Sequence, residues 1–454
     1  GDHRDLHSFP TRRSSDLGCG VYKRYSRPEM NTSGLYGSAE TADTTTIASL
    51  SWKELFADPL LQSLIEEGLQ NNTDLKIARL RVEEAEASLF AAKLAYLPLL
   101  SLEPQGNISS FDGSKVSKTY NLAATASWEV DIFGRITNAK RGAKAYHEQS
   151  KAYEQAVQTT LVATIANLYY SLLMLDEQRE ISQKTTESLR RNVEVLTVLK
   201  RAGQANAAHV AQAEANLLSV EASLLTFRKE TNELENALSK LLGRVPEAAQ
   251  RGRLLSQNFP DQLAVGVPIQ LLSNRPDVRH AEYTLAQAFY ATNEARSAFY
   301  PSIVLGGSAG WTNSVGEMII NPGKWLLSAV GSLVQPVFNQ GANTARLRIS
   351  KAQQEQALLS FRQMLFDAGV EVNNALCQWQ TARQKQELNK AQIQTLQSAV
   401  RSTQLLMQHG DTNYLEVLIA QQTLLQAELV NASDKFEEIQ GVINLYHALG
   451  GGQF

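Results

Sequence analysis

The sequence has 454 residues, enough for one large domain or several ordinary ones, and a net charge of −3. This charge gives no overall basic field that would point to nucleic acid. Apolar residues make up 43% of the chain but form no run of about 18, so we expect no transmembrane helix, and a membrane-spanning form would need a closed β-barrel. Two cysteines, Cys19 and Cys377, exclude a disulfide framework, and Cys377 is expected to be a small buried residue of a helix.

The N-terminal residues 1–17 contain no apolar signal core. Residues 5–17 resemble translated sequencing-adapter sequence, and we interpret 1–17 as a non-native segment that replaces a signal peptide. Gly18-Cys19-Gly20 looks like the end of a bacterial lipoprotein signal, which would make Cys19 a lipidated residue at the start of an N-terminal extension over 18–50. The alternative is an ordinary free cysteine.

The rest of the chain contains two copies of one order of elements: helix, strand, strand, very long helix, helix. In each copy the first helix stops at an aromatic residue near a proline, at Tyr96-Leu97-Pro98 and at Phe299-Tyr300-Pro301. A linker and equatorial segment over 246–273 separates the copies, and a tail follows at 451–454. The first copy, 51–245, is expected to hold a helix at 72–97, strands at 99–110 and 119–132, a long helix at 135–201 and a helix at 206–242. The second, 274–450, is expected to hold the corresponding elements at 277–299, 302–312, 324–338, 341–409 and 412–448.

The expected strands alternate between apolar and polar residues. Leu122 and Trp128 share one face of the second strand, and Asn121 and Thr125 share the other. Strands of about ten residues suit a tilted passage through a bilayer. The alternative is a soluble sandwich with one hydrated face, and Pro104 fits poorly within a central strand. Because four strands cannot close a barrel, several chains would have to pool them, and three chains would supply twelve.

The long helices of roughly 67 residues would each extend about 100 Å, and such helices need partners along their length. The helix that follows the first long helix supplies an apolar contact surface, or seam. Along it, Val210, Ala213, Leu217 and Val220 recur at steps of three and four, which is a coiled-coil repeat. The two shorter helices of a copy together nearly match the long one, so they can lie end to end beside it. This arrangement puts the strands at one end and the turns near Gly203 and Gly410 at the other.

Five segments carry a family resemblance, and they occur in the order that the family shows: 128–135 (WEVDIFGR), 274–279 (NRPDVR), 298–303 (AFYPSI), 413–415 (NYL) and 449–452 (LGGG). From Cys19 to Phe454 the chain resembles the TolC-like outer-membrane factors, specifically the lipoprotein branch that serves tripartite efflux systems.

The resemblance implies a mainly α fold with a small β part, built from the duplicated protomer described above. It further implies a homotrimer whose shared twelve-stranded β-barrel lies in the outer membrane on a twelve-helix periplasmic α-barrel, with a belt from residues 261–272. The protein would be a passive exit duct for small molecules, anchored to outer-membrane lipid. Its partners would be a periplasmic adaptor and an inner-membrane pump of the RND type. Alternatives are protein secretion or metal-ion efflux by the same fold, or a periplasmic coiled-coil scaffold or adaptor.

Several residues are candidates for specific roles. Arg275-Pro276-Asp277 is interpreted as structural, because Pro276 suits the first turn of a helix and Asp277 favours its dipole. Asp411 and Thr412 are either helix caps or, through the resemblance, the periplasmic gate. The remaining candidates are Arg201, Gly203, Gln204, Asn206 and Gly410 for adaptor contact, with a solvated loop as the alternative, and Glu103, Glu129 and Asp131 for the barrel lumen, with a merely hydrated wall as the alternative.

The sequence contains no constellation that points to catalysis. The seven histidines are dispersed, without a pair at metal-binding spacing on one helix face, and no phosphate-binding loop is present. We therefore expect no enzyme activity, no cofactor and no metal centre, and the energy for transport has to come from a partner.

Overall fold

The computed structural model describes residues 22, 24–30, 34–35, 46–257, 259, 265, 274–312, 324–409 and 414–452. The chain divides into two compact units: unit 1 is Gly1–Pro28, Ser88–Lys144 and Ala286–Glu355, and unit 2 is Glu29–Ala87, Ala145–Leu285 and Gln356–Phe454. None of the helices within the described ranges is both long enough and apolar enough to span a bilayer.

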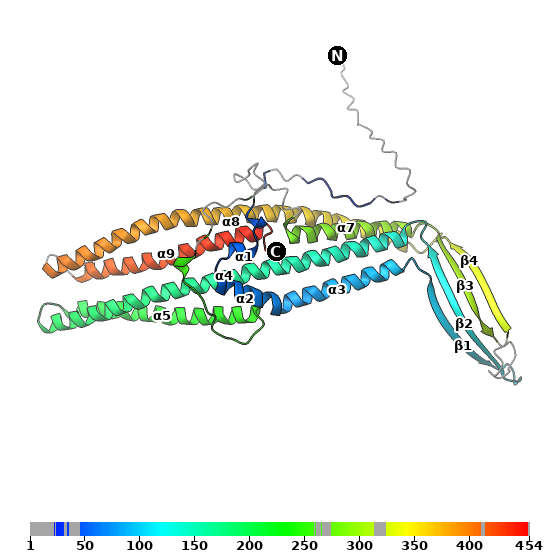
Figure 1. The fold of residues 1–454 in the computed structure, drawn as a ribbon, viewed down its shortest axis with the longest axis horizontal. Helices are drawn as coiled ribbons and strands as arrows, with labels where there is room; N and C mark the ends of the chain where they lie inside the picture. Colours follow the sequence, from blue (N-terminus) through cyan, green and yellow to red (C-terminus); the bar gives the residue numbers. More distant parts are fainter. Residues whose placement is uncertain are drawn as a thin grey trace, which may run out of the picture. The chain divides into compact units, whose positions relative to one another are not determined.

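Unit 1 contains one antiparallel sheet in the order β1-β2-β3-β4 (Figure 1). Its strands are β1 (Leu99–Ser109), β2 (Ser117–Val130), β3 (Ser302–Thr312) and β4 (Lys324–Val334). The two strand pairs that the sequence predicts in separate copies thus join through β2 and β3. Pro104 lies in β1, an edge strand within the chain, where its missing N–H donor is tolerated.

β1 ends one residue earlier than expected, and two strands end earlier by two or more residues. β2 ends at Val130 instead of 132, because the side chain of Asp131 turns to cap the next helix. β4 ends at Val334 instead of 338, just before Pro336, which cannot donate to a strand ladder. After the end of β4, the side-chain amide of Gln335 donates to the Phe299 carbonyl oxygen at 3.1 Å. A side-chain hydrogen bond thus follows the last backbone pair of the strand.

The helices follow the expected order, with two short additions at the start. The described helices are α1 (Trp52–Leu55), α2 (Pro59–Asn71), α3 (Thr73–Leu94), α4 (Arg135–Arg201), α5 (Ala207–Leu241), α7 (Pro276–Ser297), α8 (Ala342–His409) and α9 (Tyr414–Ala448). Asn72 separates α2 from α3: its side-chain oxygen accepts from the Leu75 N–H at 3.0 Å, which is an N-cap. Its amide group also donates to the Leu241 carbonyl oxygen at 3.0 Å, so this break is tied to the end of α5.

Unit 2 is held together by seams between paired helices. Figure 1 shows α5 beside α4 and α9 beside α8. Val210, Ala213 and Val220 of α5 are buried in one cluster with Leu189 of α4 and Leu418 of α9, which confirms the seam that the sequence predicts on α5. In the other pair, a Cβ on Gly441 would lie 2.9 Å from Trp379, so only glycine allows α9 to approach α8 this closely.

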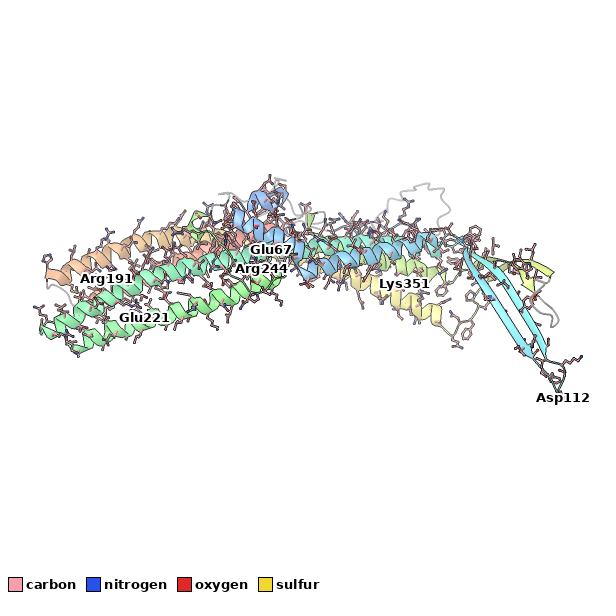
Figure 2. All side chains as sticks on the ribbon, turned by 60° about the horizontal axis from the view of Figure 1, so that its bottom comes forward. Glu67, Asp112, Arg191, Glu221, Arg244 and Lys351 are labelled. Atoms are coloured by element: carbon pink, nitrogen blue, oxygen red, sulfur yellow. The ribbon has the colours of Figure 1, made fainter. Side chains whose placement is uncertain are left out.

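Unit 2 contains a polar network that the sequence did not predict. The hydroxyl of Tyr169 donates to Asp58 Oδ2 at 2.6 Å and accepts from the Gly252 N–H at 3.0 Å. A separate ion pair joins Glu67 of α2 to Arg244, which follows α5, at 3.0 Å (Figure 2). Cys377 lies in a helix, α8, as expected, but it is exposed, so the expectation that it is buried was wrong.

Candidate functional site

The sheet of unit 1 has one apolar face built from all four strands. In antiparallel pairs, residues directly opposite one another share a face. Leu102 lies opposite Ala124, Ala124 opposite Ala309, and Ala309 opposite Leu327. Leu102 and Leu327 remain 68% and 75% exposed, so no described part of the chain covers these side chains. The apolar face comprises Leu100, Leu102, Pro104, Leu122, Ala124, Ala126, Trp128, Val130, Ile303, Leu305, Ala309, Trp311, Leu327, Ala329 and Leu333.

The opposite face of the sheet is mostly polar and hydrogen-bonded across strands. The Thr125 hydroxyl donates to Glu103 Oε1 at 3.1 Å, and the hydroxyls of Ser308 and Ser328 lie 2.7 Å apart. The edge strand β4 departs from this pattern, since Leu326, Val330 and Val334 are exposed on the polar side. An apolar face of this extent on one side and a hydrated face on the other indicate contact with two different environments.

Of the three acidic residues expected near the lumen, two are engaged at the junction of β2 with α4. Asp131 accepts from the backbone N–H groups of Ile136 and Thr137, at 2.9 and 2.7 Å, and therefore caps α4. Glu129 accepts from Arg135, with an Nε–Oε1 distance of 2.7 Å. Glu103 alone lies in the body of the sheet. The capping signal in the sequence was an aspartate five residues before Ile136, followed by Gly134.

The same junction brings the two copies of the plan together. Gly134 adopts the left-handed conformation with φ of 70°, which lets the chain turn from β2 into α4. The neighbouring Phe133 ring stacks on Tyr300, with centroids 4.9 Å apart and an interplanar angle of 12°. The Trp128 indole N–H donates to the Tyr96 carbonyl oxygen at 2.9 Å. Both helix stops found in the sequence thus contact the junction of β2 with α4.

Arg275 forms the most buried charged site of unit 2, with 2% of its surface exposed. Its guanidinium donates to both carboxylate oxygens of Asp277 through Nε and Nη2, and the Nε–Oδ1 distance is 2.9 Å. It also donates to Glu371 Oε2 at 2.7 Å and to the Ala448 carbonyl oxygen at 3.0 Å. One side chain therefore ties the start of α7 to α8 and to the end of α9, which supports the structural interpretation of the Arg-Pro-Asp motif.

The charges of this site reinforce one another. Burial by itself would lower the pKa of Arg275, but the hydrogen bonds to Asp277 and the charges of Asp277 and Glu371 raise it. Burial would raise the pKa of Asp277, yet the Arg275 guanidinium holds it below its ordinary value. His447 lies beside them, and burial together with the Arg275 charge lowers its pKa. The ion pair is therefore formed at neutral pH while His447 stays neutral.

The turn between α4 and α5 is built by two caps. The Gln204 N–H donates to the Leu199 carbonyl oxygen at 2.9 Å and the Gly203 N–H to that of Lys200 at 3.1 Å, with Gly203 at φ of 75°. This is a Schellman motif. Asn206 then caps α5 by accepting from the His209 N–H at 2.9 Å. Arg201, Gln204 and the two cap residues are exposed. Of the other expected site residues, Cys19, Gly410, Asp411 and Thr412 lie outside the described residues.

Within the ranges that the structure describes, no cluster of three or more histidine, cysteine, aspartate or glutamate side chains is arranged to hold a metal ion. Sequence reasoning missed one further charged group, in which Arg251 contacts Asp176 of α4 and Glu235 of α5, the latter at 2.6 Å. No local pattern marks this group, because its members are far apart in the sequence.

Comparisons with known proteins agree with this architecture. The chain is 28% identical over 446 residues to the cation efflux system protein CusC of Escherichia coli O6:H1, covering 96% of each protein. It is 26% identical to the toluene efflux pump outer membrane protein TtgC of Pseudomonas putida, covering 96% of this chain and 93% of the relative. The solved open state of the Neisseria gonorrhoeae MtrE outer membrane channel superposes with a TM-score of 0.85 at 28% identity, covering 96% of this chain and 99% of the other.

A family model described as outer membrane efflux protein matches residues 64–244 and 267–451. These two segments together span most of the chain and correspond to the two copies of the structural plan. The chain belongs to the outer membrane efflux protein family.

Proposed function

We propose that the chain is one subunit of a passive exit duct in the outer membrane, through which a tripartite efflux system releases small organic molecules. The observation that carries the proposal is the two-faced sheet of unit 1. Its apolar face suits lipid, and its polar face, which includes Glu103 and Thr125, suits a water-filled lumen.

We propose a homotrimer because the sheet has open edges. Among the described strands, β1 pairs only with β2, and β4 pairs only with β3. Unpaired edges of this kind seek another strand. Pairing β1 of one copy with β4 of the next would satisfy both edges, and three copies would close a sheet of twelve strands. Glu129 and Asp131 would then lie at the rim of the lumen, and Glu103 within it.

The partners follow from the same proposal. A periplasmic adaptor would contact the exposed α4–α5 turn at Arg201, Gly203, Gln204 and Asn206, together with Gly410. Asp411 and Thr412 would form the gate. An inner-membrane pump of the RND type would supply the energy. Cys19 would carry a lipid anchor at the start of the extension over 18–50, and residues 246–273 would contribute to a belt around the helices.

A matched pair of substitutions tests the orientation of the sheet. Leu102 and Glu103 are neighbours in the middle of β1 on opposite faces. Arginine on a lipid-facing position costs about 2–4 kcal/mol near the bilayer centre, whereas lumen positions tolerate charge. We expect Leu102→Arg to prevent assembly in the outer membrane. Glu103→Arg should assemble normally and shift the conductance in planar bilayers towards anions.

Two results would contradict the proposal. One is equal assembly of both variants, since a lipid-facing and a water-facing position cannot tolerate arginine alike. The other is a purified particle whose mass, measured by light scattering with the detergent subtracted, differs from three times the chain mass of 50.0 kDa.

Labelling with a palmitate analogue, after a secretion signal is fused before Gly18, tests the proposed lipid anchor. The label should be lost in Cys19→Ser.

Metal ions are a second candidate cargo, favoured by the similarity to a cation efflux protein. Complementation distinguishes organic cargo from metal-ion cargo. The chain is expressed with its own adaptor and pump in a host that lacks its outer-membrane efflux proteins. Restored tolerance to toluene and hydrophobic drugs supports organic cargo. Restored tolerance only to copper or silver salts would replace it by metal-ion efflux.

A further inference from the structure

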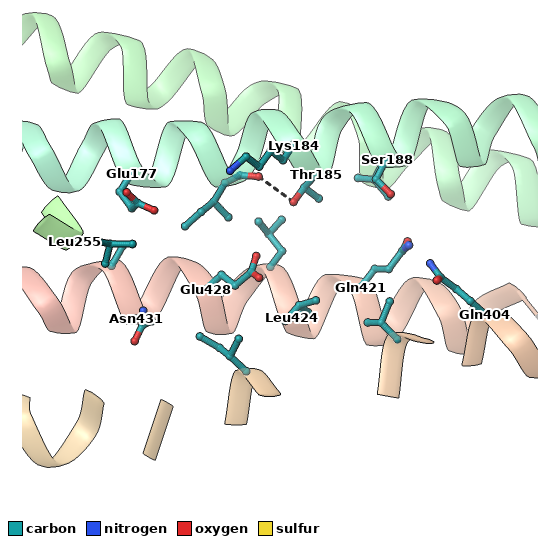
Figure 3. Close-up of a pocket in the computed structure, with 16 residues that line it drawn as sticks. Glu177, Lys184, Thr185, Ser188, Leu255, Gln404, Gln421, Leu424, Glu428 and Asn431 are labelled. Atoms are coloured by element: carbon teal, nitrogen blue, oxygen red, sulfur yellow. Dashed lines mark hydrogen bonds between the residues drawn. The ribbon is translucent and has the colours of Figure 1, made fainter. Parts of the chain in front are cut away.

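Unit 2 contains a pocket of about 500 Å³ between α4, α8 and α9 (Figure 3). Leu255, in the short helical turn η3 (Leu254–Ser256), closes one side of it. A cavity of this size accommodates a drug-sized molecule. Neither the described fold nor the proposed duct uses it.

The lining of the pocket is half apolar and half polar, and its polar part includes two acidic groups. Ile393 and Val400 of α8 and Leu424 of α9 supply apolar surface. Figure 3 shows Glu177 on α4 and Glu428 on α9, both with carboxylates extending into the space between these helices. Carboxylates that approach one cavity from two helices make its interior attractive to positive charge.

The neighbouring cations leave these carboxylates incompletely compensated. Lys184 also lines the pocket, but its ammonium group binds Glu180 at 2.7 Å on the exposed surface of α4. Within the described part of the chain, the Glu177 carboxylate has no hydrogen bond or ion pair, while Glu428 accepts a hydrogen bond from the Gln397 side chain. Burial is the main reason why the pKa of each carboxyl lies above its ordinary value.

Asn431, which also lines the pocket, has a buried side-chain oxygen without a hydrogen-bond partner among the described residues. Buried acceptors normally have a donor. A ligand with a positively charged group would be attracted by the two carboxylates that line this cavity, whereas an anion would be repelled by them.

We propose that this pocket binds an amphiphilic organic monocation, with its apolar body against Ile393 and Leu424 and its positive centre between Glu177 and Glu428. This site lies beyond the proposed duct function, because it needs neither transport nor a partner. The site is specific for charge sign as well as shape, and the experiment uses that property.

Two probes of the same shape and opposite charge test the proposal: tetraphenylphosphonium and tetraphenylborate. Binding to the full chain in lipid nanodiscs is measured by equilibrium dialysis. We expect saturable binding of the cation, at one site per chain, that the borate does not compete for. Glu177→Gln and Glu428→Gln preserve shape and remove charge, and each should weaken cation binding about tenfold.

Two further variants complete the design. Leu424→Trp fills the cavity and should abolish saturable binding, while the thermal stability of each variant shows whether it remains folded. Glu230→Gln removes an exposed carboxylate of α5 outside the pocket and should leave binding unchanged. The proposal is overturned if the parent chain shows no saturable cation binding, if Glu177→Gln combined with Glu428→Gln binds as the parent does, or if the borate binds the same site equally well.

Discussion

Arg275 and Glu371 form an ion pair, with 2.7 Å between Nη1 and Oε2, that joins the residue before α7 to the middle of α8. The same guanidinium holds Asp277 and the last carbonyl of α9. Arg275 is buried, but the side chains of Asp277 and Glu371 are 32% and 51% exposed, so its removal costs less than the about 3–5 kcal/mol of a fully buried pair and leaves the Ala448 carbonyl without its donor. We therefore expect Arg275→Met to lower the thermal unfolding midpoint, measured by circular dichroism. Arg228→Met, which removes an exposed arginine of α5, should leave the midpoint unchanged; an equal loss in both would refute the role of Arg275.

Replacement by alanine should have opposite effects on stability at Gly134 and at Gly142. Gly134 has φ of 70°, a conformation that costs a residue with a Cβ about 1–2 kcal/mol. An added Cβ would also lie 3.3 Å from the Asn138 side chain and 3.4 Å from the Tyr22 ring. Gly142 lies inside α4, where an added Cβ makes an ordinary 3.7 Å contact with Tyr290. Denaturant unfolding should show that Gly134→Ala destabilises the protein and that Gly142→Ala stabilises it by up to about 1 kcal/mol. Equal effects would count against the left-handed turn as the cause.

Acidification should destabilise unit 2 through two half-buried histidines. Burial lowers the pKa of His447 and of His280 below the ordinary value of 6.5. The unfolded chain therefore takes up protons near that value while the folded chain resists them. Stability is present above 6.5 and is lost as the pH falls through the folded pKa. The melting midpoint should drop between about pH 8 and about pH 5.5, and His447→Gln combined with His280→Gln should flatten this part of the profile. An unchanged slope in that variant would assign the acid sensitivity to other groups.

Cation binding in the pocket should weaken with acid at a higher pH than ordinary glutamates would cause. Burial raises the pKa of Glu177 above 4.5, assisted by Glu180 and opposed by Lys184 and Arg253. Burial also raises that of Glu428, opposed by Gln397 and Lys184. Each carboxyl becomes neutral as the pH falls through its raised pKa, and its attraction for a cation is then lost. Dialysis with tetraphenylphosphonium across this range should give a midpoint above 4.5, and a midpoint below 4.5 would contradict burial as the cause.

The proposed gate gives a prediction for electrical recordings. If three copies of Asp411 surround one axis, each raises the cost of deprotonating the others and attracts divalent cations. Asp411→Ala should then raise the conductance in planar bilayers a few-fold and weaken block by divalent cations. Asn206→Ala, which removes the cap of α5, controls for the loss of a turn-forming residue. Normal trimers of Asp411→Ala with parental conductance and cation block would mean that Asp411 is a cap and that the gate lies elsewhere.

The sequence by itself determined the periodic parts of this protein. Alternation in β1 and β2, steps of three and four on α5, and proline after each first helix predict strands, seams and helix ends, because each depends on residues that are close in the chain. It also predicted the duplicated plan and, through five short segments, the family. The sequence predicted element boundaries less accurately where a side chain accepts backbone hydrogen bonds and ends an element early, as Asp131 does after β2.

Only the tertiary structure decided how distant residues combine. The register between β2 and β3 places the apolar residues of both copies on one face, and no local pattern specifies that register. Glu371 meets Arg275 across 96 residues, and Glu177 faces the same pocket as Glu428 from another helix. Such contacts depend on which helices pack together, and packing is set by the summed burial of many side chains; a single motif does not encode it.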